Sequence, residues 1–302
     1  MVVTYRPDRE ALAVTLAALV PQTGAVVVVD NTGGDSAAGS AITPGAAVVL
    51  AQTQNIGLAA AQNLGITWAR ARGFRFVLLL DQDSLPAPGM VASLLQALGD
   101  RRDTVPVAAV GPRFHDAREQ ADAPFVRIGF PFNRKLRCAS DGLPVECDFL
   151  ISSGMLIPLS VIDAIGDMDA DLFIDNVDLE WSFRARARGY TLLGVCATRL
   201  LHCLGDARRT LPFALRGVVV HAPLRLYYMM RNRVLLYRFP HTPRLWVAQD
   251  VPRVLVKLFL FGVLIGPRRR NLRCMLRGLQ DGVRGLSGQA PRDLVGRDPS
   301  LR

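Results

Sequence analysis

Residues 76–84 read FVLLLDQDS, an apolar run that ends in two carboxylates one residue apart. The run predicts a buried strand, and Asp81 and Asp83 follow at its carboxyl end. Two carboxylates in this position can reach a hard divalent cation that keeps water and phosphate oxygens as its other ligands. A solvated turn that leads into Pro86 and Pro88 is the alternative interpretation.

Short apolar runs and helical stretches alternate on both sides of this segment, which is typical of a parallel sheet wound by crossover helices. The sequence therefore predicts an α/β fold. Strands are expected over residues 2–4, 25–29, 47–51, 76–80 and 108–111, and later over 191–196 and 198–201. Helices are expected over residues 9–19, 58–72 and 89–98. The stretch from 114 to 148 resembles a variable loop or a β excursion.

Polar side chains follow the predicted strands where each strand ends. They are Thr4 and Tyr5 after the first strand, Asp30 and Asn31 after the second, and Asn55 and Gly57 after the third. In an open parallel sheet, ligands bind outside the carboxyl ends of the strands. One such residue is usually a helix cap or turn residue, but several that share one edge predict a ligand site.

A second acidic segment, LFIDNVDLEWSFRARARGY, occupies residues 172–190 and leads into a helix that Gly189 ends. Asp178 lies near the amino end of this helix, where the helix dipole favours a carboxylate, and this suits a general base. Glu180 and Arg184 are four residues apart and are expected to pair. Trp181 either stacks on an acceptor sugar or anchors the interior. An acidic helix start that only caps is the alternative for the cluster.

Three further positions each have a structural and a functional interpretation. Ser153 and Gly154, in the segment FLISSGMLIP at 149–158, either form a tight bend or let a substrate approach closely. His202 follows a strand and is either structural or a ligand. Arg231 either binds a phosphate of a lipid diphosphate or lies on a solvated helix face.

The positive charge of the chain belongs to its last third. The whole chain has 36 Lys and Arg against 26 Asp and Glu, whereas residues 1–200 have 17 against 21 and residues 201–302 have 19 against 5. Residues 254–266 form an apolar run too short to span a bilayer, and arginines flank it on both sides. This pattern predicts a helix at an anionic membrane surface, and a basic helix packed on the main domain is the alternative.

The five cysteines include no C-x-x-C pair and are odd in number, which argues against a disulfide scaffold and a zinc ribbon. We therefore expect a reducing cytoplasm.

Four motifs, VVTY at 2–5, VVDN at 28–31, NIGLAAAQNLGI at 55–66 and LLDQDS at 79–84, resemble the nucleotide-sugar half of family 2 glycosyltransferases. The Asp-Gln-Asp-Ser form is similar to that of bacterial rhamnosyltransferases, and the resemblance extends to about residue 240. It implies a GT-A fold with a catalytic domain over 1–215 and a helical, basic, membrane-associating region over 216–302. Within the catalytic domain it implies a nucleotide-sugar and metal half over about 1–112 and an acceptor and base half over about 145–215.

The resemblance also implies roles for the candidate residues. The nucleotide sugar is expected at Thr4, Tyr5, Asp30, Asn31, Asn55, Gly57, Asn63 and Asp81, and Mg²⁺ or Mn²⁺ at Asp81, Asp83 and His202. The acceptor is expected at Ser153, Gly154, Glu180, Trp181 and Arg231. Asp178 is the expected base. The acid that normally precedes the base in this family is Val177 here, so Asp175 is the alternative base.

The predicted function is an inverting, metal-dependent transfer of L-rhamnose from dTDP-L-rhamnose to a lipid-linked or cell-surface polysaccharide, on the cytoplasmic face of a bacterial membrane. A UDP- or GDP-linked donor is the first alternative. From another class, a haloacid-dehalogenase-type phosphatase would use Asp81 as its nucleophile, although that chemistry requires the motif on the first strand. A nucleic-acid partner is not expected. A dinucleotide oxidoreductase is disfavoured because no G-x-G-x-x-G follows the first strand.

Overall fold

The computed structural model describes residues 1–34, 47–101, 106–116, 121–139, 142–202, 207–209 and 218–295. The chain divides into two compact units. Unit 1 consists of Met1–Ala170 and Asp178–Cys203, and unit 2 of Asp171–Val177 and Leu204–Arg302. The short segment 171–177, which directly precedes Asp178 in the sequence, thus belongs to unit 2.

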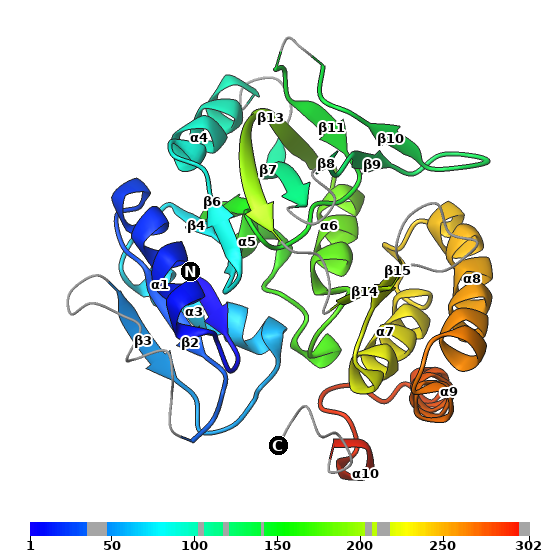
Figure 1. Ribbon diagram of the computed structural model, residues 1–302. Coiled ribbons are helices and arrows are strands. Elements are labelled where there is room, and N and C mark those ends of the chain that lie inside the picture. Colours follow the sequence, from blue (N-terminus) through cyan, green and yellow to red (C-terminus); the bar gives the residue numbers. More distant parts are fainter. Residues whose placement is uncertain are drawn as a thin grey trace. The chain divides into compact units, whose positions relative to one another are not determined.

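Unit 1 contains a parallel sheet of four strands in the order β3-β2-β1-β5 (Figure 1). Its strands are β1 (Val2–Thr4), β2 (Val27–Asp30), β3 (Val48–Ala51) and β5 (Leu80–Asp81). Every neighbouring pair is parallel, so all four strands end at the same edge. This edge carries the polar strand ends that the sequence predicts.

A second, mixed sheet of unit 1 has seven strands and follows the path β11-β13-β7-β12-β4, with β6 beside β13 and β8 beside β7. The long strands β7 (Val107–Asp116) and β13 (Thr191–His202) run parallel to each other. The others are β4 (Phe76–Leu78), β6 (Ser84–Pro86), β8 (Ala121–Asp122), β11 (Val145–Cys147) and β12 (Leu156–Pro158). β12 is antiparallel to both of its neighbours.

The first helix of unit 1 begins at a side-chain cap that the sequence provides. The Asp8 carboxylate caps α1 (Arg9–Leu19) by accepting a hydrogen bond from the Ala11 N–H at 2.9 Å. The remaining helices are α3 (Leu58–Ala71), α4 (Met90–Arg101), α5 (Leu159–Ile165) and α6 (Val177–Ala187), with a 3₁₀ turn at Val20–Gln22. A second 3₁₀ turn at Ala170–Leu172 lies where the chain passes from unit 1 to unit 2. The core of unit 1 packs apolar side chains of both sheets against α1 and α4, including Val2, Leu12, Leu94, Val110 and Leu156.

The α/β fold is confirmed, and two strand predictions need correction. The run 76–80 is not one strand, because β4 pairs in the mixed sheet and β5 pairs with β1 in the parallel sheet. Leu79, between them, donates its N–H to the Met155 carbonyl and accepts from the Gly154 N–H. The two strands expected over 191–201 are a single strand, β13, with a register shift between Val195 and Arg199.

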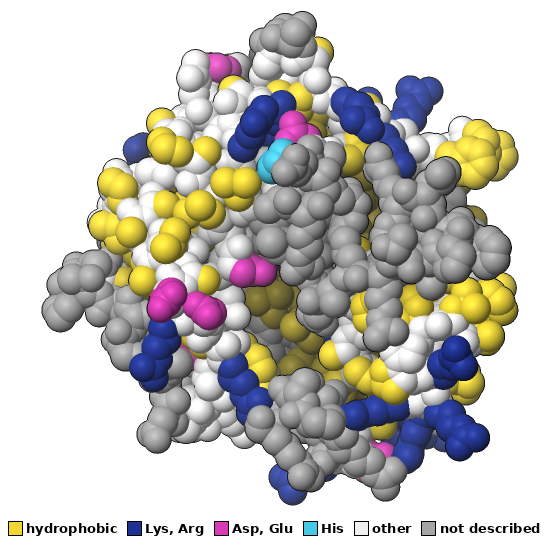
Figure 2. Space-filling view, viewed as in Figure 1, with side chains coloured by type: hydrophobic (Ala, Val, Ile, Leu, Met, Phe, Trp, Pro, Cys, Tyr) yellow, Lys and Arg dark blue, Asp and Glu magenta, His cyan; other side chains and the backbone are white. Residues whose placement is uncertain are grey.

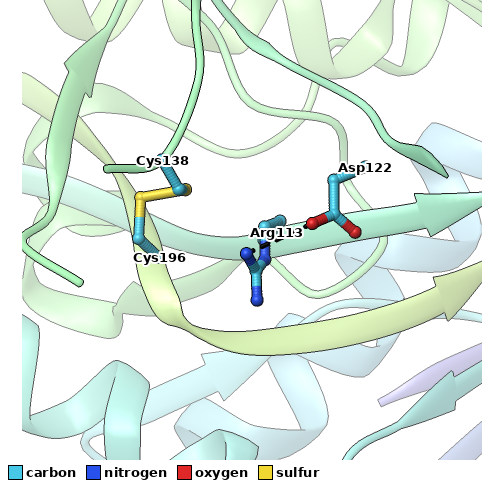
Figure 3. The surroundings of a disulfide bond; sticks show 4 residues. All are labelled: Arg113, Asp122, Cys138 and Cys196. Carbon is cyan, nitrogen blue, oxygen red and sulfur yellow. Dashed lines mark ion pairs between the residues drawn. A yellow bond between two sulfur atoms is a disulfide. The ribbon is translucent and has the colours of Figure 1, made fainter. Parts of the chain in front are cut away.

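The cysteine pattern argued against disulfide bonds, and this prediction was wrong for one pair of cysteines. Cys138, which follows the hairpin of β9 (Phe125–Arg127) and β10 (Arg134–Leu136), forms a disulfide with Cys196 of β13. Figure 3 shows this bridge beside Arg113, whose guanidinium pairs with Asp122 at 3.2 Å. The bridge joins segments 58 residues apart, a pairing that spacing alone does not reveal. The cysteine pattern therefore gives no argument for a reducing compartment.

Unit 2 is mainly helical. It contains α7 (Pro223–Leu236), α8 (Arg244–Phe259), a π-helical turn (Leu260–Leu264), α9 (Arg268–Arg284), α10 (Arg292–Val295) and an antiparallel pair of strands, β14 (Ala207–Arg209) and β15 (Val218–Val220). α7 and α9 pack closely because Gly278 and Gly282 of α9 face the backbone of α7. A Cβ at Gly282 would lie 2.8 Å from the Arg231 carbonyl oxygen. Within the described residues, no helix is long and apolar enough to cross a membrane.

Candidate active site

The ends of β1 and β2 are joined by buried polar side chains. Thr4 donates its hydroxyl to Asp30 Oδ1 at 3.1 Å, and both side chains are buried. The same oxygen accepts from the backbone N–H and the hydroxyl of Thr32, at 3.0 and 2.6 Å. Thr32 in turn accepts from the Arg6 N–H. The buried Asp30 carboxylate therefore orders the two loops that leave the sheet at this edge.

Asn31 and Asn55 hold the loop that leads into α3. Asn31 donates its amide to Asn55 Oδ1 at 2.9 Å and accepts from the Ile56 N–H at 2.8 Å. Asn55 Oδ1 also accepts from the Gly57 N–H at 2.9 Å. Gly57 has a φ of +88° directly before the helix, a conformation that favours glycine. The structure thus brings these three predicted residues together at the amino end of a helix of 14 residues.

Asp81 is the last residue of β5, and Gln82 and Asp83 follow it in a turn. Gln82, which the sequence analysis did not single out, accepts from the Tyr5 N–H at 2.7 Å and donates to the Tyr5 carbonyl at 3.3 Å. Asp81 is half-buried and Asp83 is exposed. Gln82 therefore joins the ends of β1 and β5. Asp81 and Asp83 lie on either side of Gln82 at this edge of the sheet.

Three consecutive residues connect this strand end to Asp178. Ser152 donates its N–H to Asp178 Oδ2 at 3.2 Å, and Ser153 Oγ accepts from the Asp81 N–H at 3.2 Å. Gly154 donates to the Leu79 carbonyl at 2.7 Å and has a φ of +83°. The segment thus links the predicted base to the strand that carries the acidic pair.

Close contacts restrict the side chains that fit at positions 153 and 154. A Cβ at Gly154 would lie 2.7 Å from the Pro112 side chain, so no other residue fits without a shift. Ser153 Oγ lies 2.7 Å from Ser84 Oγ, and both hydroxyls are buried. The bend predicted at Ser152–Gly154 is therefore present, and it also positions the strand that ends in Asp81.

Asp178 lies in the first turn of α6 and is partly exposed. Its Oδ1 accepts from the Leu179 N–H at 2.8 Å, while Oδ2 accepts from Ser152. Both contacts hold the carboxylate at the amino end of the helix, where the helix dipole stabilises negative charge.

The structure contradicts the predicted acceptor site at two residues, Glu180 and Trp181. Trp181 has an exposed fraction of 0% and donates Nε1–H to the Gly166 carbonyl, so it cannot stack on a sugar in solution. Glu180 is buried and forms the predicted pair with Arg184, through two contacts of 2.9 and 2.8 Å. Both side chains anchor α6 in the interior.

Asn63 and Arg231 also serve the fold. Asn63 holds the backbone of Met168 with both ends of its amide, at 2.8 and 2.9 Å, so we leave it out of the proposed nucleotide site. Arg231 in unit 2 has an exposed fraction of 0% and donates to the carbonyls of Leu172 and Gly288. The prediction that Arg231 binds a phosphate is therefore wrong, because its guanidinium is buried against the backbone.

Asp175, the alternative base, lies in unit 2 in a loop with unusual backbone. Phe173, Asp175 and Asn176 all have positive φ, between 63° and 65°. Asn232 donates its amide to the carbonyls of Leu172, Ile174 and Asp175, each at 2.8 Å. The Asp175 carboxylate pairs with Arg225 at 3.2 Å. Asp175 thus pairs with a cation, and Asp178 accepts hydrogen bonds from two backbone N–H groups.

The acidic pair fits a divalent cation by the chemistry of its oxygens. Among the described residues, no group of three or more His, Cys, Asp or Glu is placed to hold a metal ion. Asp81 and Asp83 supply two carboxylates, and a cation there would complete its shell with water and diphosphate oxygens, an arrangement that Mg²⁺ readily accepts. His202 ends β13 opposite Ser84, and its side chain lies outside the described residues.

A model of glycosyl transferase family 2 matches residues 1–153. The chain belongs to glycosyl transferase family 2. The matched range is about half of the chain and includes the polar strand ends, Asp81, Asp83 and Ser153. The protein is therefore a glycosyltransferase, and the phosphatase alternative is set aside.

Two curated proteins are similar to this family 2 chain. The dTDP-rhamnosyl transferase RfbF of Shigella flexneri is 27% identical over 292 residues, covering 95% of this chain and 96% of that protein. The galactofuranosyltransferase GlfT1 of Mycolicibacterium smegmatis is 29% identical over 217 residues, covering 66% and 68%. The first relative thus spans both units.

Solved structures share the fold at low identity. TarS 1–349 of S. aureus in complex with UDP-GlcNAc has a TM-score of 0.57 at 13% identity, and the match covers 98% of this chain and 82% of that chain. GalNAc-T7 with UDP, GalNAc and Mn²⁺ has a TM-score of 0.56 at 13% identity, with 99% of this chain covered. The chain spans 57% of the GalNAc-T7 chain. These similarities confirm the GT-A-type fold.

Proposed function

We propose that this glycosyltransferase moves L-rhamnose from dTDP-L-rhamnose to a saccharide on a lipid carrier, with inversion at the anomeric carbon. The observation that carries the proposal is the link through Ser152 and Ser153 between Asp178 and the strand that ends in Asp81. The similarity to a dTDP-rhamnosyl transferase over nearly the whole chain supports the choice of donor.

The donor nucleotide fits the edge of the parallel sheet. Thr4, Tyr5, Asp30 and Asn31 would contact its base and ribose, and Asn55 and Gly57 would line it at the start of α3. The polar network among these residues orders the edge before the donor binds, which lowers the entropic cost of binding. Ser153 and Gly154 would flank the acceptor.

In the proposed reaction, Asp178 accepts the proton of the acceptor hydroxyl as the oxygen attacks the anomeric carbon from the face opposite the leaving group. The bond between the anomeric carbon and the diphosphate breaks, and its electron pair leaves with the nucleoside diphosphate. A divalent cation held by Asp81 and Asp83 would, when bound, neutralise the charge that develops on the diphosphate. The backbone contacts to Asp178 hold its carboxylate in place for the proton.

The base assignment is tested by Asp178→Asn, which keeps the shape of the side chain and one oxygen acceptor. We expect kcat for rhamnosyl transfer to fall by about 10³-fold, with KM for the donor and the unfolding midpoint nearly unchanged. Asp175→Asn is the matched variant, and we expect it to lower kcat by less than about tenfold, since it loses only a partly exposed ion pair. Wild-type turnover by Asp178→Asn would contradict the assignment, and a large loss confined to Asp175→Asn would transfer the role to Asp175.

The donor and metal assignments are tested by thermal stabilisation. At a hundredfold excess over Kd, a ligand stabilises a protein by about 2.7 kcal/mol, so dTDP-L-rhamnose with Mn²⁺ should raise Tm measurably. We expect EDTA or Asp83→Ala to remove the increment that depends on Mn²⁺, while Asp100→Ala, an exposed acid on α4, should leave it intact. Stabilisation by UDP- or GDP-sugars alone would overturn the choice of donor.

We also propose that unit 2 binds a membrane surface. Its helices expose large apolar side chains four residues apart, such as Val251, Leu255 and Phe259 on α8, and Leu272 and Leu276 on α9. The exposed arginines Arg268, Arg269 and Arg273 lie at the start of α9. In Figure 2, apolar side chains gather over α8 and basic ones over α9. A basic, apolar surface of this kind is typical of proteins that lie on anionic bilayers.

We place this contact at the cytoplasmic face of the membrane. Disulfides are rare in the cytosol, so at this location Cys138 and Cys196 would be a dithiol in cells. Alkylation of thiols in intact cells, followed by mass spectrometry of the two peptides, tests the location. Recovery of an oxidised pair from freshly quenched cells would contradict it.

A further inference from the structure

The loop between β9 and β10 exposes two aromatic rings. Phe130 and Phe132 have exposed fractions of 85% and 81%, the largest values among the large apolar side chains of the described residues. In Figure 1 this loop extends beyond the strands of its hairpin, and Figure 2 shows an apolar cluster at the same position. Exposed apolar groups of this size mark contact sites.

The base of this hairpin is held firmly to the body of unit 1. The Phe125 ring is buried against Gly194 of β13, where a Cβ would collide with it. Asp148 Oδ2 accepts from the Ile128 N–H at 2.6 Å. The Asp148 N–H also donates to the Val126 carbonyl of β9 at 2.9 Å. The base that carries the exposed tip is therefore rigid. Little conformational entropy of the hairpin backbone is lost when a partner binds.

The charge of the hairpin is entirely positive. From Ala123 to Ala139 the sequence has four cations, Arg127, Arg134, Lys135 and Arg137, and no acid. Arg127 pairs with Glu146 at 2.8 Å, while Arg134, Lys135 and Arg137 are exposed on the strand that follows the two rings and just beyond it. Aromatic rings next to exposed cations match the interface of an anionic bilayer, where the rings enter the headgroup region and the cations meet phosphates.

We propose that the β9–β10 tip is a membrane-docking element of unit 1, which inserts Phe130 and Phe132 into the interface of an anionic lipid bilayer. This surface is distinct from the apolar face of unit 2, and it does not depend on the identity of the sugar donor or acceptor.

The test is co-sedimentation of the full chain with vesicles, without donor or acceptor. We expect Phe130→Ser/Phe132→Ser to lower the partition constant on phosphatidylcholine–phosphatidylglycerol vesicles by about tenfold. The loss should appear both in the otherwise native chain and in a Leu255→Ser/Phe259→Ser background, which separates this surface from that of unit 2. Val14→Ser/Val48→Ser, which removes two exposed apolar side chains elsewhere in unit 1, should leave binding unchanged.

A second readout reports insertion directly. In Phe132→Trp, the difference emission relative to wild type should shift to the blue on anionic vesicles and be quenched by brominated lipid chains. Unchanged binding by the serine variant, or a tryptophan that stays in water, would overturn the proposal. Equal vesicle binding with impaired transfer to a soluble saccharide would also overturn it and assign the rings to the acceptor.

Discussion

At the scale of single residues, burial separates the acids of α6. Asp178 and Glu180 are two residues apart, yet Glu180 is buried against Arg184 while Asp178 is partly exposed and held by backbone N–H groups. A carboxylate that accepts a proton from a substrate must be accessible to that substrate, and of these two acids only Asp178 is partly exposed.

Lys257 of α8 shows a related effect in unit 2. Burial, and to a smaller extent the charge of Arg233, lowers the pKa of Lys257 to about 8. In the unfolded chain the pKa is higher, so between about pH 8 and 10.5 the unfolded state binds more protons than the folded state. The contribution of Lys257 to the free energy of unfolding should therefore rise with pH in this window.

We predict that Lys257→Met removes this rise and stabilises the protein at pH 7 by about 3 kcal/mol. Urea denaturation at pH 7, 9 and 10.5 measures both effects. The only other lysine of the sequence, the exposed Lys135, provides the control variant Lys135→Met, for which we expect no change. Parallel pH profiles for wild type and Lys257→Met would contradict the prediction.

At the scale of elements, contacts between distant segments fix the positions of the site strands. β4 and β5 are consecutive in the sequence but belong to different sheets, and the chain crosses between them at Leu79. Gly154 and Met155 bind the backbone of Leu79 on both sides. This crossing places Asp81 at the edge of the parallel sheet beside β1.

The disulfide is an element-scale constraint on the mixed sheet. Because it joins residues separated by 58 positions, reduction should lower the free energy of unfolding by about 4 kcal/mol through the entropy of the unfolded chain. Urea denaturation with and without dithiothreitol measures the loss. In Cys138→Ser/Cys196→Ser, dithiothreitol should have no further effect, and equal stability of the oxidised and reduced wild-type chain would contradict the prediction.

At the scale of the whole molecule, acidic and basic side chains are concentrated in different parts of the sequence. Residues 1–200 carry more acids than bases, whereas residues 201–302 carry 19 bases and 5 acids. The acids in the first part include the strand-end and helix-start carboxylates, and the arginines in the second part accompany the exposed apolar rows of α8 and α9. The chain thus combines a net acidic first part, which contains the proposed catalytic residues, with a basic second part, which we propose binds an anionic surface.

We predict that Leu255→Ser/Phe259→Ser lowers binding of the full chain to anionic vesicles by about tenfold, because both side chains lose their apolar contact with the bilayer. Rhamnosyl transfer to a soluble acceptor should stay within about twofold of wild type, since both residues lie outside the proposed site. Vesicle co-sedimentation and a transfer assay on the same preparations give the two values. Undiminished vesicle binding would show that this face does not meet the membrane.

The sequence by itself determined the features that consecutive residues encode. It predicted the helices at 9–19 and 58–72 to within a residue, the polar ends of the first strands, and the position of Asp178 at a helix start. These predictions succeeded because apolar periodicity, caps and strand-end polarity are local patterns.

Only the tertiary structure decided which polar side chains are available for chemistry. The residue types and the family resemblance predicted binding roles for Trp181, Glu180, Asn63 and Arg231. In the structure, distant backbone carbonyls and a neighbouring arginine pair with these side chains instead. The Cys138–Cys196 disulfide and the crossing of the chain between the two sheets at Leu79 also depend on contacts between distant segments. Burial and pairing depend on which segments fold against one another, and the spacing of residues along the chain does not contain that information.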